Sequence, residues 1–162
     1  MHSEDPTIYL IPKHLFRQQM DMPSKPDPVP FGKARVRRSG RDVTVVSWGN
    51  CIEQALESAA KLDGDVSVEV IDLRSIVPYD EAAVMASVSK TKRAVVVHEA
   101  VTRCGFGAEL SSRIHEELFG TLAAPVQRVG GKNIPIPYAS NLEKAFLPQV
   151  ADVVAAVKRT NK

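Results

Sequence analysis

Cysteine is scarce in this sequence. Cys51 and Cys104 are the only two among 162 residues, and they form neither a Cys-x-x-Cys motif nor the Cys/His spacing of a zinc site. This scarcity argues against a disulfide framework and against a structural zinc centre. It also favours a reducing compartment over secretion.

The chain also lacks an excess of either charge. Its 21 basic and 19 acidic residues give a net charge of +2, which creates no broad field to attract nucleic acid or an anionic membrane. Lys33, Arg35 and Arg37 fall on one face of an expected strand, but no aromatic residues interleave them, and edge strands often carry such charges to prevent unwanted pairing. We therefore predict no nucleic-acid partner.

Long apolar runs are absent as well. No stretch approaches the roughly 18 apolar residues of a membrane span, and the first twenty residues lack the order of a signal peptide. The chain contains no P-loop, no Gly-x-Ser-x-Gly motif and no metal-spaced histidine pair. We expect a soluble protein with no membrane partner and no self-evident catalytic machinery.

What the sequence does contain divides into two unequal parts. Residues 1–30 carry one apolar burst, "TIYLIP", followed by "MDMPSKPDPVP", in which four prolines within eight positions favour an extended linker. Too few residues precede this linker to bury a core of their own. We therefore interpret residues 1–30 as the remnant of a preceding domain plus a linker, and residues 31–162 as one α/β domain.

Strand and helix patterns alternate from Phe31 onward. Apolar β-branched runs lie in 43–46, 65–73, 93–99 and 124–130, and segments with apolar residues at helical spacing separate them. Ser39 and Gly40 predict a hairpin turn between residues 34–36 and 43–46. This rhythm indicates a three-layer α/β/α fold, with a mostly parallel sheet of about five strands and one antiparallel edge strand.

Helix ends are predicted from capping residues. Asn50, with Glu53 three residues later, predicts a capping box at the start of the first helix. Asp80 predicts the start of the second helix, and Pro148 suits the first turn of the last one.

His98 and Glu99 form the first candidate for chemistry. They end a buried strand, and ligands of open α/β sheets gather at the carboxyl ends of strands. Because no partner set for catalysis is visible, we favour a His98 that is hydrogen-bonded at a strand end or interface over one that contacts a ligand.

The segment "GFGAEL" is the second candidate. Gly105 and Gly107 could let the backbone approach a phosphate, but Leu110 stands where a dinucleotide fingerprint has its third glycine, and Glu109 places negative charge in the first helical turn. Tight packing of strand against helix is the preferred interpretation of these glycines.

Several longer motifs occur in a characteristic order. The segments "DLRSIVPYD", "VVHEA" and "GFGAEL", within a chain running from "PFGKARVRRSGRDVTVVSWG" to "PIPYASNLEKAFLPQVADVVAAV", resemble the C-terminal half of the beta subunit of thiamine-diphosphate-dependent 2-oxo acid dehydrogenases. The resemblance covers nearly the whole chain. The His-Glu-Ala form is most similar to the branched-chain members, whereas pyruvate and acetoin relatives often differ there.

The resemblance implies a transketolase C-terminal-like domain in an oxidoreductase of pyruvate metabolism or branched-chain amino acid catabolism. Thiamine diphosphate and magnesium belong to other domains of the full enzyme, so we expect this chain to bind neither and to be inactive alone. The implied roles are subunit assembly, with a homodimer contact and an alpha-subunit partner, and docking to the acyltransferase core. The implied location is the bacterial cytoplasm or the mitochondrial matrix.

The expected interface combines the loop after the strand 93–99 with the apolar segment "GGKNIPIPYA". Its candidate residues are His98, Glu99, Arg103, Gly105, Gly107, Ile134, Ile136 and Tyr138. The rival hypothesis is a stand-alone small-molecule-binding module that uses a pocket near His98 and Gly105, and an independent enzyme is a third.

Overall fold

A five-stranded mixed sheet forms the centre of the protein. The computed structural model describes residues 4–12, 19, 24 and 30–161. The strand order is β1-β3-β2-β4-β5, with β1 antiparallel to β3 and all other neighbours parallel. The strands are β1 (Arg35–Arg38), β2 (Val43–Ser47), β3 (Val68–Asp72), β4 (Ala94–Val101) and β5 (Gln127–Gly131). The predicted fold class and its antiparallel edge strand are confirmed.

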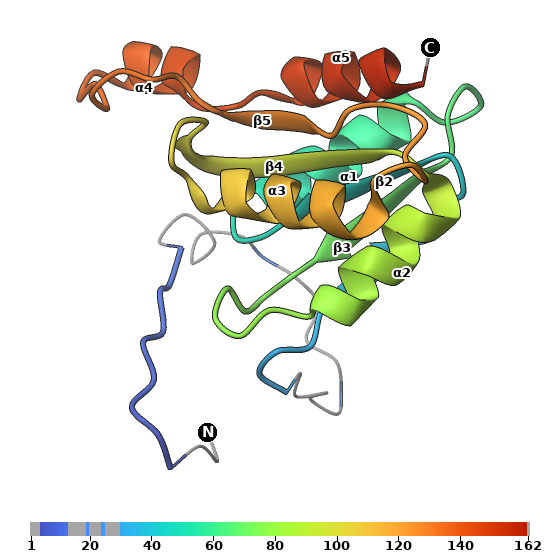
Figure 1. Ribbon diagram of the computed structural model, residues 1–162. Coiled ribbons are helices and arrows are strands. Elements are labelled where there is room, and N and C mark those ends of the chain that lie inside the picture. The colour runs from blue at the N-terminus through green and yellow to red at the C-terminus, as the bar shows by residue number, and fades with distance from the viewer. Residues whose placement is uncertain (1–3, 13–18, 20–23, 25–29, 162) are drawn as a thin grey trace.

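Helices cover both faces of this sheet, and one of them was not predicted (Figure 1). They are α1 (Cys51–Lys61), α2 (Glu81–Thr91), α3 (Phe106–Leu118), α4 (Ser140–Phe146) and α5 (Val150–Thr160). Helices α1 and α5 pack on one face, and α2 and α3 on the other. The short α4 directly follows the apolar segment "GGKNIPIPYA" of the expected interface.

Alternating side chains of the strands build the two halves of the core. Val95 and Val97 face α1 and α5, whereas Val96 between them faces α2 and α3. All three are fully buried, because a parallel sheet with helices on both sides buries both of its faces. This explains the almost continuous valine run of β4.

The predicted hairpin between β1 and β2 is wrong. Arg35 and Val36 pair with Asp72 and Ile71 of β3 instead. Strand β2 lies at the sheet centre and pairs with β3 on one side and β4 on the other, so both of its edges are already occupied. The chain after β1 must therefore cross β3 before it enters β2.

Two of the three helix-start predictions need correction. Asn50 makes no capping bond to α1, because its side-chain amide binds Glu99. Asp80 caps α2 as predicted, accepting from the Ala83 amide. Helix α5 begins at Val150, and Gln149 forms a capping box with Asp152, so Pro148 lies before the helix rather than in its first turn.

A buried polar network ties β2, β3 and α2 together near the amino ends of the strands. The Glu69 carboxylate accepts hydrogen bonds from the Ser87 hydroxyl, from Lys90 Nζ at 2.5 Å and from the Gly40 amide at 3.3 Å. The Thr44 hydroxyl bonds to that of Ser87 at 2.7 Å. Glu69 is 4% exposed, so this network satisfies a charge inside the protein.

The N-terminal residues run away from the domain. Residues 4–12 are extended (Figure 1), and Ile8, Tyr9 and Leu10 are largely solvent-exposed. Exposed apolar side chains of this kind often mark a contact site. Most of the predicted proline-rich linker lies outside the described residues.

Candidate functional site

His98 is buried at the point where β4 leaves its regular pairing with β5. The register of the two strands shifts between Val97 and Val101, and the His98 side chain is 1% exposed. Neither ring nitrogen has a hydrogen-bond partner. The prediction of a hydrogen-bonded His98 is therefore wrong, and a buried imidazole without partners replaces it.

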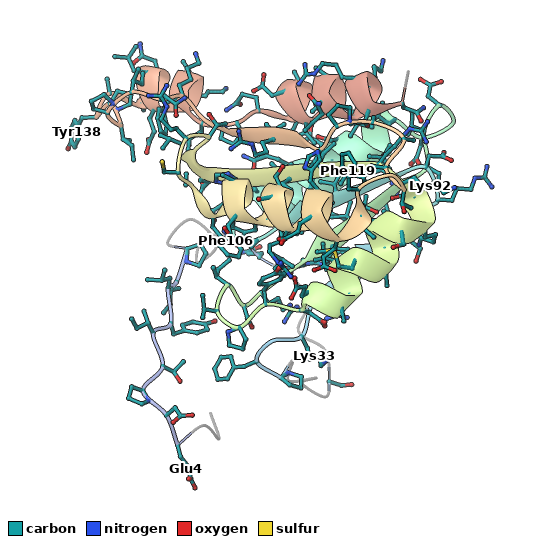
Figure 2. The ribbon with its side chains drawn as sticks, viewed as in Figure 1. Glu4, Lys33, Lys92, Phe106, Phe119 and Tyr138 are labelled. Carbon is teal, nitrogen blue, oxygen red and sulfur yellow. The ribbon has the colours of Figure 1, made fainter. Side chains whose placement is uncertain are left out.

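One aromatic ring stacks on His98, and two more extend the aromatic cluster away from it. The imidazole stacks on the indole of Trp48, with ring centroids 5.4 Å apart and planes inclined by 6°. Phe106 meets the same indole edge-on at 5.5 Å, and Tyr79 meets Phe106 at 5.8 Å. Figure 2 shows Phe106 at the start of α3. Trp48 was not predicted as a site residue, because its stacking contact with His98 forms only when β2 and β4 pair.

Gly105 and Gly107 bring α3 directly against the imidazole ring. A Cβ atom on Gly107 would lie 2.4 Å from His98 Nε2, and one on Gly105 would lie 2.7 Å from Cε1. These distances leave no room for a side chain at either position. The preferred interpretation of the two glycines as packing residues is confirmed, because the ring occupies the space that a side chain at either position would need.

Burial also determines the charge of His98. Loss of water contact, together with the positive charge of Arg128, lowers the pKa of His98 from its ordinary value of 6.5. The ring is therefore neutral at physiological pH. A neutral, inaccessible imidazole is poorly placed to exchange a proton with a ligand, so this geometry gives no support to acid-base chemistry at His98.

Glu99 binds on the other side of β4. Asn50 Nδ2 donates to both of its carboxylate oxygens, at 3.0 and 3.1 Å. Burial and the nearby Glu99 carboxylate raise the pKa of the Cys51 thiol to about 12, so this thiol stays protonated and unreactive. The predicted pair of His98 and Glu99 thus faces two different environments and does not act as one unit.

The loop after β4 is joined to the segment after β5. The Arg103 amide donates to Asn133 Oδ1 at 3.1 Å, and the Thr102 amide donates to the Gly131 carbonyl at 3.2 Å. Arg128 Nη1 donates to the Thr102 carbonyl at 2.7 Å. These hydrogen bonds hold the two segments of the expected interface side by side.

Apolar side chains project from this surface. Ile134 is 53% exposed, Ile136 is 71% exposed and Tyr138 is fully exposed. Figure 2 shows Tyr138 pointing away from the body of the protein, in the chain that leads to α4. Leu142 of α4, which was not predicted, is also half exposed. We call Ile134, Ile136, Tyr138 and Leu142 the apolar strip.

Other candidate ligand sites are poorly supported. Within the described part of the chain, no three His, Cys, Asp or Glu residues gather as a metal site would require, and no helix there is long and apolar enough to cross a membrane. On the basic edge strand, Arg37 lies 3.5 Å from Asp72, and Arg38 pairs with Asp63. These carboxylates reduce the positive field that a nucleic acid would need.

Fold and sequence together define the class of the domain. It is a three-layer α/β domain with an antiparallel edge strand. Residues 32–153 match the family described as "Transketolase, C-terminal domain". The chain belongs to this family.

Two similar proteins are beta subunits of 2-oxo acid dehydrogenases. The chain is 44% identical over 156 residues to the "Pyruvate dehydrogenase E1 component subunit beta" of Rhizobium meliloti (strain 1021), covering 95% of the chain and 34% of that protein. It is 47% identical to the "3-methyl-2-oxobutanoate dehydrogenase subunit beta" of Mycobacterium tuberculosis (strain CDC 1551 / Oshkosh), covering 96% of the chain and 45% of that protein. The resemblance to beta subunits of pyruvate and branched-chain 2-oxo acid dehydrogenases is confirmed. The chain spans half or less of these relatives.

A solved structure shares the fold. A chain of "Split gene transketolase, inactive beta4 tetramer" superimposes with a TM-score of 0.69 and 28% sequence identity, over 82% of this chain and 43% of that one.

Proposed function

We propose that the chain contributes an assembly domain to the beta subunit of a thiamine-diphosphate-dependent 2-oxo acid dehydrogenase. In this proposal residues 31–162 form the domain, and residues 1–30 are the end of a preceding pyrimidine-binding domain with its linker. The observation that carries it is the apolar strip. Solvent-facing loops are ordinarily polar, and a contiguous apolar patch on such a loop marks a protein interface.

Backbone hydrogen bonds hold the end of the apolar strip at Ile134. The Lys132 amide donates to the Phe146 carbonyl at 3.4 Å, and the Ile134 amide donates to the Lys132 carbonyl at 2.8 Å. Pro135 and Pro137 restrict the backbone between the exposed side chains. A surface ordered before binding loses less conformational entropy on association, which suits a permanent subunit contact.

The partners we propose are a second copy of the chain, the alpha subunit and the acyltransferase core of the complex. A homodimer contact requires a surface that complements itself across a twofold axis, and the apolar strip with the loop 102–105 provides the candidate. The tetramer of beta chains named for the split-gene transketolase supports association of such chains without catalytic activity. Pyruvate and 3-methyl-2-oxobutanoate, named for the relatives, are the candidate substrates of the full enzyme.

The described residues do not fit thiamine diphosphate. A magnesium diphosphate group needs several oxygen ligands and a phosphate-binding loop, but the acidic residues do not gather as such a site requires. The Gly105–Gly107 turn is filled by His98. We therefore assign cofactor binding to other parts of the enzyme. The compartments we propose for the enzyme are the bacterial cytoplasm or the mitochondrial matrix.

We predict that the chain does not bind the cofactor. Isothermal titration with thiamine diphosphate and magnesium should give only heats of dilution, because no described cluster can hold the diphosphate. An intact pyruvate dehydrogenase E1 from a relative serves as the positive control. Saturable binding at micromolar cofactor would overturn the assignment.

We predict that Ile136→Asp weakens self-association about 10- to 100-fold, since burying an unpaired carboxylate at an apolar contact costs a few kcal/mol. Sedimentation equilibrium over a range of concentrations measures the effect. Phe119→Asp is the matched control. Phe119 is 87% exposed, but it lies just after the C-terminal end of α3, whereas the expected interface lies near the N-terminal end of that helix (Figure 2). A wild-type monomer at every concentration, or equal weakening by both substitutions, would contradict the interface.

A further inference from the structure

His98 is a titratable group inside the protein whose hydrogen-bonding capacity is entirely unused. Both ring nitrogens are buried and unpartnered, although a neutral imidazole has one donor and one acceptor to satisfy. An unmet buried polar group costs free energy. Packing against Trp48, Gly105 and Gly107 must therefore hold the ring in place.

None of the elements packed around the ring offers a group that would stabilise its charged form by a hydrogen bond. The residue that follows β2, Trp48, contributes its indole, and β5 contributes the cation of Arg128. Helix α3 contributes two glycines and Phe106, and its positive N-terminal end also opposes a cation. Glu109 in the first turn of α3 makes no hydrogen bond with the ring, and Glu99 is bound by Asn50.

We infer that His98 is a pH-sensitive latch: the neutral ring holds the first turn of α3 and the loop 102–105 closed against β4, and protonation opens them. The structural basis is the contact of the ring with Gly105 and Gly107, which bound this loop and begin this helix. The latch goes beyond the proposed function and does not depend on association. If the loop is also an interface, opening would loosen the dimer in mild acid.

The direction of the pH effect follows from proton linkage. In the closed form the pKa of His98 lies below 6.5, and in an open, hydrated form it returns to that ordinary value. Opening therefore takes up a proton as the pH falls below 6.5. The ratio of closed to open molecules falls by up to about tenfold per pH unit until the pH reaches the pKa of the closed form, and then stops changing.

The face of the Trp48 indole attracts cations and works against this effect. Two observations oppose that attraction, namely the nearly complete burial of the ring and the nearby Arg128. The net lowering of the His98 pKa indicates that the neutral ring is preferred in the closed form.

The test uses Trp48 as an internal reporter on the full chain. Trp48 is the only tryptophan, so its fluorescence reports on the stack with His98. The pH is lowered from 8 to 5 while three signals are followed: Trp48 emission, the NMR titration of the His98 ring and hydrogen exchange of the amides in 102–108. His98→Asn and His98→Phe remove the titrating group in two different ways, so one folded variant suffices.

His115→Gln is the matched control, because His115 lies on α3 but is bonded to the Ser111 carbonyl through Nδ1 at 2.8 Å. We expect the pKa of His98 to lie below 6.5, with coincident changes in emission. After correction for the intrinsic exchange rate at each pH, the amides in 102–108 should lose protection at least tenfold in acid. Both His98 variants should lose these changes, and His115→Gln should keep them. An ordinary or raised His98 pKa, or acid-induced exchange that persists in the His98 variants, would overturn the latch. Sedimentation at pH 8 tests the interface separately.

Discussion

Glu69→Ala is expected to destabilise the domain by about 3 kcal/mol without affecting the apolar strip. The substitution removes the acceptor of three hydrogen bonds, from Ser87, Lys90 and the Gly40 amide. Hydrogen bonds to a charged group contribute about 1.5–3 kcal/mol each, and their loss is not additive. Lys90 is half exposed and regains water, which limits the loss. Urea unfolding monitored by circular dichroism measures the change.

The contribution of the Glu69 carboxylate to stability should also depend on pH. Burial works to raise the pKa of Glu69, but the hydrogen bonds from Lys90, Ser87 and Gly40 outweigh it and lower the pKa below its ordinary value of 4.5. A carboxylate with a lowered pKa stabilises the fold fully above its unfolded value and loses that contribution as the pH falls below about 4.5. Wild type should therefore lose stability below pH 4.5 more steeply than Glu69→Gln.

The control for both experiments is Glu57→Ala. Glu57 forms an exposed ion pair with Lys61 at 2.9 Å on α1, and exposed pairs of this kind contribute less than about 1 kcal/mol. Equal effects of Glu69→Ala and Glu57→Ala would show that the buried network does not support the fold. The network lies at the opposite end of the strands from the candidate interface, so Glu69→Ala should leave self-association unchanged in the folded fraction.

The sequence predicted the fold well where local pattern and burial agree. The valines of β4 alternate between two apolar faces, which identifies a strand covered on both sides. Pairing of β1 depended on information that is not local. A turn at Ser39 and Gly40 suggests a hairpin, but the edges of β2 are taken by β3 and β4, and only the complete sheet shows this.

The candidate site was harder to predict for the same reason. Exposure of Ile134, Ile136 and Tyr138 was predicted because these apolar residues alternate with prolines. The structure shows all three side chains exposed. The environment of His98 could not follow from its own segment, since Trp48, Gly107 and Arg128 come from three other elements. Helix α4 was missed because seven residues give too short a periodicity to recognise.

Gly107→Ala is expected to destabilise the protein by about 2 kcal/mol, although the same exchange within an unhindered helix stabilises by roughly 0.5–1 kcal/mol. The new methyl group would lie 2.4 Å from the His98 ring, and overpacking of a filled core costs about 1–3 kcal/mol. Ala108→Gly, at the next position of α3, measures the intrinsic helix preference alone. Thermal and urea unfolding of both variants separate the two effects.

A double-mutant cycle with His98→Ala identifies the cause of the clash. If the imidazole is the obstacle, its removal makes space for the methyl group, and the double variant should be at least about 1 kcal/mol more stable than the sum of the single changes predicts. If Gly107 is needed for another reason, the two changes will simply add. Additivity would be evidence against an energetic contact between His98 and α3, and both the packing role of Gly107 and the latch depend on that contact. Coupling would show that the ring and the start of the helix form one packed unit.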